Sequence, residues 1–243
     1  MNARFHIGLS GYSYKPWQGP DRFYPPDLKH ADFLKYYATR YDTVELDGLW
    51  YRLPGDKAVS NWMAATPDHF VFAPKVHRQI THRYRLKPDC YSFLDVMVTQ
   101  LAPMAVAHRL GPWLIQLPPN LTRDDDRLER FLHQLPRSHR WAVEFRHDSW
   151  YEPGVETLLK QSNVSWVAAD TDDRPAELRQ TADFWYIRLR KTEYDHTALG
   201  HWAERIKEAN RQGMDCFVYC KHEDQGSPWV WADTLLRLIT PTE

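Results

Sequence analysis

The feature that most constrains the fold is the alternation of short strand-like segments with amphipathic helical ones along all 243 residues. The expected strands are Phe5–Leu9, Thr43–Leu46, Phe70–Lys75, Trp113–Leu117, Arg140–Phe145, Val164–Ala169, Phe184–Leu189 and Cys216–Cys220. Apolar residues spaced three or four apart fill most of the gaps between them. Among these helical segments, we expect Ser92–His108 to form one helix, Thr122 to cap the next, and Ser227-Pro228 to begin the last.

Strand followed by helix, eight times in a chain of this length, predicts an α/β fold. We expect one domain over residues 1–243, a single (β/α)₈ TIM-like barrel, because such barrels need about 250 residues. The unit between the sixth and seventh strands is weak: the segment Asp170–Asp183 contains Asp172, Asp173 and Pro175, so its helix is expected to be weak or missing. An open doubly wound sheet is the alternative, but Gly8–Gly11 lacks the glycine-rich phosphate turn usual there.

Composition limits the classes of partner and compartment. The net charge is −1, so no general attraction to nucleic acid or membrane is expected. Three cysteines, Cys90, Cys216 and Cys220, without a C-x-x-C pair predict reduced thiols and a cytoplasmic protein. No apolar run has the roughly 18 residues that a membrane span requires, and the first residues lack the apolar core of a signal peptide. The oligomeric state stays open.

The alternation within the strands predicts where polar side chains gather. When the apolar side of each strand is assigned to the helices, one polar residue per strand remains inward near the carboxyl end. These residues are Ser10, Glu45, Lys75, Gln116, Glu144, Asp170, Arg188 and Lys221. Because barrel interiors are normally apolar and buried charges are costly unless paired, this ring predicts a ligand cavity. The alternative is a self-satisfied network in which Glu45 pairs with Lys75 and Asp170 pairs with Arg188.

The carboxylates in this ring suggest acid–base chemistry. Glu144 and Asp170 are expected on adjacent strands, where each raises the proton affinity of the other, and such a pair can supply a general acid. Glu45 and Lys75 are the further catalytic candidates. The cations that could hold a phosphate or carboxylate are Arg146, Arg188 and Lys221.

Two long loops, after the first and third expected strands, lie at the end of the barrel where active sites occur. Tyr12 and Trp17 in the first loop, together with Trp150, are candidates to stack on an apolar part of a ligand. The second loop, Val76–Tyr91, is basic. The remaining candidate substrate contacts are His77, Arg78, His82, His147 and His222. Because no H-x-x-x-H or H-x-H spacing organises the histidines, we predict no cofactor and assign no metal ligands, and a bound metal ion stays an open alternative.

Five motifs spread over nearly the whole chain carry a family resemblance. They are Gly8-Leu9-Ser10-Gly11-Tyr12, Thr43–Leu46 with Trp50–Pro54, Phe70–Lys75 with Ile80-Thr81-His82, Leu114–Pro119, and Glu144–Trp150. The sequence resembles the domain-of-unknown-function-72 family, which implies a TIM-like barrel and no established reaction. Members of the family often have Arg-Leu-His-Gly after the seventh strand and paired Asn with His after the eighth. Here Arg190-Lys191 and Lys221-His222-Glu223-Asp224 depart from these patterns, which predicts a different ligand.

The sequence therefore predicts an enzyme of hydrolase or lyase type that acts on a small anionic substrate, phosphorylated or carboxylated, at the carboxyl end of the strands. One alternative is a nucleic-acid phosphodiesterase or repair-type enzyme, with or without a metal ion, that uses the basic loop on phosphates. Another is a non-catalytic sensor of a small anion. A glycosidase is a further alternative, suggested by carboxylates and tryptophans in a barrel.

Overall fold

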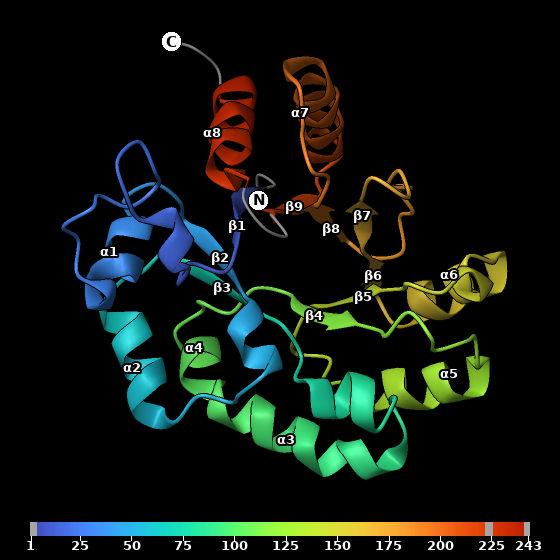
Figure 1. Ribbon diagram of the computed structural model, residues 1–243. Helices are drawn as coiled ribbons and strands as arrows, with labels where there is room; N and C mark the ends of the chain where they lie inside the picture. The colour runs from blue at the N-terminus through green and yellow to red at the C-terminus, as the bar shows by residue number, and fades with distance from the viewer. Residues whose placement is uncertain (1–3, 222–225, 241–243) are drawn as a thin grey trace.

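The computed structural model describes residues 4–221 and 226–240 of the chain, so His222, Glu223 and Asp224 lie outside the described residues (Figure 1). The strands are β1 (Phe5–Ser10), β2 (Thr43–Leu46), β3 (Val71–Pro74), β4 (Trp113–Gln116), β5 (Trp141–Glu144), β6 (Val164–Trp166), β7 (Ala168–Asp170), β8 (Phe184–Leu189) and β9 (Asp215–Cys220). The helices are α1 (Phe33–Tyr37), α2 (Asp56–Ala64), α3 (Tyr91–Gln100), α4 (Ala102–Val106), α5 (Asp125–Gln134), α6 (Pro153–Gln161), α7 (His196–Arg211) and α8 (Pro228–Ile239).

All strand pairs are parallel, and the strands form two sheets. One sheet has the order β3-β2-β1-β9-β8-β7, and the other has the order β4-β5-β6. Parallel neighbours require crossover connections, and helices supply most of them, as the alternation of patterns predicts. The α/β fold with parallel sheets and helices is thus confirmed.

The predicted closed barrel is not confirmed, because no continuous ladder joins the two sheets among the residues that the structure describes. Isolated bridges, Phe72 with Leu110 and Lys75 with Leu114, connect the β3 side to the β4 side. At the other junction, Val167 separates β6 from β7, and its amide donates to the carbonyl of Val143 on β5 at 3.0 Å. The segment 171–183, which is described throughout, has bends and no helix, in agreement with the weak unit expected there.

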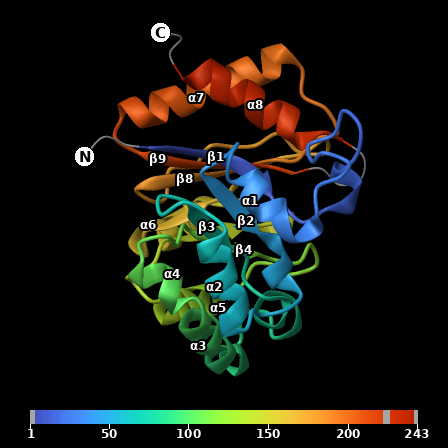
Figure 2. The ribbon, with the colours of Figure 1, turned by 90° about the vertical axis from the view of Figure 1, so that its left-hand side faces the viewer.

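Helices cover the outer faces of the sheets. In Figures 1 and 2, α7 and α8 lie side by side over β1, β8 and β9, while α2 to α5 lie along the opposite side of the molecule. No described helix is both long and apolar enough to cross a membrane. The single helix expected over Ser92–His108 is instead α3 followed by α4, because Pro103 has no amide hydrogen with which to continue the hydrogen bonding of α3. The cap of α5 is Asp124 rather than Thr122, since its carboxylate accepts from the Arg127 amide at 3.0 Å.

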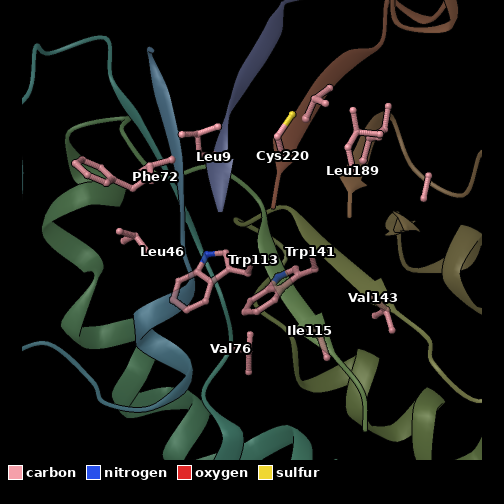
Figure 3. Close-up of a cluster of buried hydrophobic side chains, with 14 of the residues drawn as sticks. Leu9, Leu46, Phe72, Val76, Trp113, Ile115, Trp141, Val143, Leu189 and Cys220 are labelled. Atoms are coloured by element: carbon pink, nitrogen blue, oxygen red, sulfur yellow. The ribbon is translucent and has the colours of Figure 1, made fainter. Parts of the chain in front are cut away.

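Two apolar clusters lie on opposite faces of the strands. The larger one faces the helices and includes Leu9, Phe72, Trp113, Trp141 and Leu189, which come from both sheets (Figure 3). The smaller one is made of residues from the other face: Ala73, Leu114, Ala142, Val167, Ala182, Phe184, Tyr186, Phe217 and Tyr219. Polar side chains on this second face therefore lie next to an apolar cluster and need partners of their own.

Candidate functional site

The centre of the site is the side chain of Arg188 on β8, which is fully buried. Its Nη2 lies 2.9 Å from Glu45 Oε1 on β2, and its Nη1 lies 2.5 Å from Glu144 Oε2 on β5. Both carboxylates are buried as well, at 0% and 2% exposure. One guanidinium thus holds two carboxylates from different sheets in a geometry that favours strong, charge-assisted hydrogen bonds.

Neighbouring side chains satisfy the remaining oxygens of the two carboxylates. Gln116 Nε2 donates to Glu144 Oε1 at 2.8 Å, and Arg190 Nη1 lies 3.3 Å from the same atom. Tyr186 donates to Glu45 Oε2 at 2.8 Å, and the Ser10 hydroxyl donates to Glu45 Oε1. The structure therefore brings together the predicted residues Ser10, Glu45, Gln116, Glu144 and Arg188.

This network fixes the charges of its carboxylates. Burial alone would raise the pKa of Glu144, but Arg188 and then Arg190 outweigh it and hold that pKa at about 2. Burial and Arg188 oppose each other in the same way at Glu45, and the pKa of Glu45 is lowered. Both side chains are therefore ionised at neutral pH, and neither has the raised proton affinity expected of a general acid.

Lys75 is buried near this network, with 6% exposure. It forms no salt bridge within residues 4–221 and 226–240, and its Nζ lies 5.5 Å from the centre of the Trp50 ring. Burial and the nearby cation Arg188 lower its pKa to about 8, although Glu45 opposes the shift. Lys75 can therefore exchange a proton near neutral pH, unlike the two carboxylates.

The prediction that Asp170 lies on the inner face is wrong. Parallel pairing aligns Ala169 with Arg188 and Asp170 with Leu189, so Asp170 points to the face opposite Arg188. There its Oδ2 accepts from the Trp202 indole of α7 at 3.4 Å and lies 3.2 Å from Lys191 Nζ. Asp170 therefore pairs with Lys191 rather than with Arg188.

The basic loop after β3 places two of the predicted contacts against Trp50 and a third against Tyr51. His82 packs edge-on against the Trp50 ring, with the ring centres 5.0 Å apart, and the Arg78 guanidinium lies 5.8 Å from the ring centre. His77 forms a hydrogen bond with the Tyr51 carbonyl at 3.1 Å. Burial lowers the pKa of His82, and Lys75 and Arg146 add to the shift, so these cations lie near one another. Lys221 follows β9 and is half-buried.

Trp17 and Trp150 do not fit the stacking role predicted for them. Trp17 is 8% exposed and packs against Phe23 and Trp229. Trp150 is 1% exposed, and its indole donates to the Leu121 carbonyl at 2.7 Å. His147 also has a local structural partner, since its Nδ1 lies 2.9 Å from the Ser149 hydroxyl. Large aromatic residues beside polar motifs more often fill a core than contact a ligand.

A polar cavity of about 420 Å³ opens beside Glu144, and we call it the arginine cavity. Its lining consists of Glu144, Phe145, Arg146, Tyr151, Ala169, Thr171, Asp172, Asp173, Arg174 and Arg190. Arg174 pairs with Asp148 and lies over the Tyr151 ring, while Asp172 accepts hydrogen bonds from Thr192. Arg146 is exposed and forms no salt bridge with any residue in the described part of the chain.

Several residues of this site escaped prediction from the sequence. Tyr186 lies in the middle of β8, where its aromatic character suggested core, and Arg174 lies in the irregular segment after β7. Arg190 and Trp50 belong to motifs to which the sequence assigns no role. The spacing of Tyr186 and Arg188, two apart on one strand, is the signal that places both on the inner face. In the described residues, no group of three or more His, Cys, Asp or Glu side chains has an arrangement able to hold a metal ion.

The fold and the buried ring define an α/β protein of parallel sheets with a charged network at the carboxyl ends of its strands. The chain belongs to the DUF72 family of proteins of unknown function, whose model matches residues 6–242. The UPF0759 protein YunF of Bacillus subtilis is 26% identical over 96% of this chain and 94% of its own length. The UPF0759 protein YecE of Escherichia coli K12 is 32% identical over 68% of this chain and 59% of its own length.

Solved structures support the fold. A DUF72 family protein of Thermotoga maritima, TM1631, has a TM-score of 0.76 at 21% identity, covering 97% of this chain and 99% of that one. Another, EF0366 of Enterococcus faecalis, has a TM-score of 0.77 at 17% identity, covering 99% of both chains. At these identities the likeness concerns the fold, so the chemistry of the site must be argued from its own residues.

Proposed function

We propose that this protein is an enzyme that acts on a small anionic substrate, phosphorylated or carboxylated, bound in the arginine cavity. The observation that carries the proposal is that three arginines, Arg146, Arg174 and Arg190, line a cavity beside the buried carboxylate of Glu144. Planar guanidinium groups bind phosphate and carboxylate through paired hydrogen bonds. The cavity lies at the carboxyl ends of β5 and β7, where α/β enzymes bind their substrates.

The residues divide into binding and proton-transfer roles under this proposal. Arg146, which has no salt bridge with a described residue, is the group that an anionic substrate recruits first. Glu144 is ionised and orients a hydroxyl or a water molecule in the cavity. Lys75, whose pKa is about 8 and which interacts electrostatically with Glu144, is the group that changes protonation near neutral pH. Glu45 positions Arg188, and Asp170 holds α7 in place.

We also infer that the two sheets act as one barrel-like ring around this site. The Lys75–Leu114 bridge supports this inference at one junction, and the Val167–Val143 hydrogen bond supports it at the other. Arg188 adds a side-chain link, because it joins Glu45 of one sheet to Glu144 of the other. Such a ring concentrates strand ends, and their polar side chains, at one rim.

The first test measures anion binding by calorimetry, with inorganic phosphate and malonate as probes. Arg146→Met is expected to weaken binding by about tenfold, the loss typical of one charge-assisted contact. Arg130→Met is the matched control, since Arg130 is an exposed residue of α5 outside the cavity. Equal binding by wild type, Arg146→Met and Arg130→Met contradicts the assignment of the cavity.

The second test separates an enzyme from a sensor. Phosphate monoesters and hydroxy acids are incubated with wild-type protein, and products are followed by NMR. The proposal expects turnover that Lys75→Met abolishes and that Arg130→Met leaves intact. Tight binding of a compound without turnover of any of them favours a non-catalytic anion sensor instead.

A nucleic-acid phosphodiesterase or repair-type activity is the second candidate, and one surface feature favours it. Tyr51 is 65% exposed, and the Arg78 guanidinium lies 5.9 Å from its ring centre. An exposed ring beside a cation can stack on a base and contact a phosphate. Fluorescence anisotropy with a single-stranded oligonucleotide at low and high salt tests this candidate. Binding that weakens with salt and is lost in Tyr51→Ala supports it; undetectable binding at low salt excludes it.

A further inference from the structure

A second, larger pocket of about 610 Å³ lies apart from the arginine cavity, and we call it the tyrosine pocket. The loop after β1, the turn after β2 and helix α2 form its walls. Its main side chains are Tyr12, Tyr14, Asp47, Tyr51, Leu53 and Trp62. The pocket shares none of its lining residues with the arginine cavity, so its ligand is a separate question.

The walls of this pocket are held in place by the core. The buried Tyr24 hydroxyl donates to the Tyr12 carbonyl, and the Tyr14 ring packs on Trp17 with ring centres 4.8 Å apart. Gly11 has φ of +86°, and a side chain there would collide with the Tyr14 ring and with Asp47. Glycine at this position therefore allows Tyr14 to approach Asp47, and the pocket is formed before any ligand arrives.

Asp47 gives the pocket its charge preference. The Tyr14 hydroxyl donates to Asp47 Oδ2, while Oδ1 accepts no hydrogen bond from the residues that the structure describes. Burial raises the pKa of the Asp47 carboxyl, although the hydrogen bond from Tyr14 opposes this. Lys221 and Lys75 also favour the ionised form of Asp47, and this carboxylate can contact a positive ligand group through Oδ1. The other charged lining residue, Arg52, is exposed.

We propose that the tyrosine pocket binds a small organic cation, an alkylated ammonium group held by the aromatic rings and by Asp47. Aromatic faces attract quaternary ammonium groups because the ring carries negative charge on its face, and cages of such rings recognise choline-like ligands. The three tyrosines and Trp62 supply the rings, and Asp47 supplies the counter-charge. The volume leaves room for a substituent on the cation.

The experiment is an NMR titration of the full-length protein with choline and with dimethylbutanol, in which carbon replaces the charged nitrogen. Choline is expected to bind and dimethylbutanol to bind at least about tenfold more weakly, because only the cation interacts with Asp47 and the ring faces. Asp47→Asn and Trp62→Leu are each expected to weaken choline binding by about tenfold. Equal affinity for the two probes, or undiminished binding by Asp47→Asn, overturns the proposal.

A second pair of variants covers the case in which Asp47→Asn or Trp62→Leu does not fold. Ala58→Leu fills the pocket from α2, and Ser60→Leu adds the same side chain at an exposed position of that helix outside the pocket. Choline binding is expected to be lost in Ala58→Leu and retained in Ser60→Leu. Retention in both overturns the proposal. Phosphate binding in the arginine cavity is a separate readout, so failure here leaves the proposed function untouched.

Discussion

Glu144 and Asp170 are both buried carboxylates at the carboxyl ends of strands, yet they have opposite environments. Glu144 faces the interior, where Arg188, Arg190 and Gln116 surround it. Asp170 faces the helical layer, where Lys191 and the Trp202 indole are its partners and the Lys191 side chain is 32% exposed. Successive residues of a strand point to opposite faces of the sheet. A carboxylate one position further along therefore has different partners, and removing its charge has a different cost in stability.

The largest effect is expected for Arg188→Met, which leaves both Glu45 and Glu144 buried without their shared cation. Removing one partner of a buried ion pair costs about 3–5 kcal/mol, and here two pairs are broken. The variant is expected to be unfolded, or to melt at a far lower temperature, by circular dichroism at pH 7. If Arg188→Met melts within a few degrees of wild type, the ion pairs of Arg188 with Glu45 and Glu144 contribute less to stability than their distances indicate.

Glu144→Gln is expected to lower stability by about 3–5 kcal/mol, because Arg188 loses one of its two carboxylates inside the protein. The like-charge neighbour Asp170 that the sequence predicts for Glu144 would give the opposite sign, because removing one of two repelling carboxylates stabilises a fold. Urea denaturation at pH 7 measures the change. If the urea midpoint of Glu144→Gln equals that of wild type, Glu144 does not stabilise the fold through Arg188.

Acid should remove the same contribution without mutation. The folded pKa of Glu144, about 2, lies below that of an unfolded glutamate, so its stabilisation is complete above about pH 4.3. It is lost as pH falls through the folded pKa, and the shift corresponds to about 3 kcal/mol. Wild type is therefore expected to lose stability between pH 5 and pH 2 more steeply than Glu144→Gln. If the stability of wild type and that of Glu144→Gln fall in parallel over this pH range, the prediction is wrong.

Lys75→Met is expected to stabilise the protein by about 3 kcal/mol at pH 7. Its folded pKa, about 8, lies below that of an unfolded lysine, about 10.4, so the protonated amine destabilises the fold at neutral pH. This penalty declines as pH rises from about 8 to about 10.4. The difference in stability between Lys75→Met and wild type should therefore shrink at pH 10. If Lys75→Met melts at a lower temperature than wild type at pH 7, the prediction is wrong.

Asp170→Asn is expected to cost only about 1–2 kcal/mol. The Asn oxygen can still accept from the Ala176 amide, only the long hydrogen bond from Trp202 is lost, and the ion pair with Lys191 reaches the surface. Urea denaturation beside Glu144→Gln gives the matched comparison. If the two variants lose equal stability, the difference between the two faces has no energetic consequence.

The sequence predicted the α/β class and most of the charged ring because short strands such as Trp141–Glu144 alternate clearly between bulky and small or polar residues. It failed at Asp170 because Val167, Ala168 and Ala169 differ too little to define a face. The bulky Val164 and Trp166 carried the correct signal, since both belong to the helix-facing cluster. Alternation fixes a face only where large and small residues contrast.

Features that depend on loops could not be predicted in the same way. The tyrosine pocket needs the left-handed backbone of Gly11 and the approach of Tyr14 to Asp47, which lies 33 residues away along the chain. The arginine cavity needs Arg174, which lies outside every strand and helix. Strand and helix periodicity carries no information about such contacts, because loop conformation follows from turn chemistry and tertiary packing.

The pairing of β1 with β9 also has a consequence for how the chain is made. Phe5 aligns with Cys216, and the Arg4 amide donates to Asp215 across 211 positions of sequence. At about 5–20 residues per second, synthesis leaves one edge of β1 without its partner for roughly 10–40 seconds. β1 is thus a nascent edge that other chains could extend until β9 is made, so this protein is expected to need chaperone protection during translation.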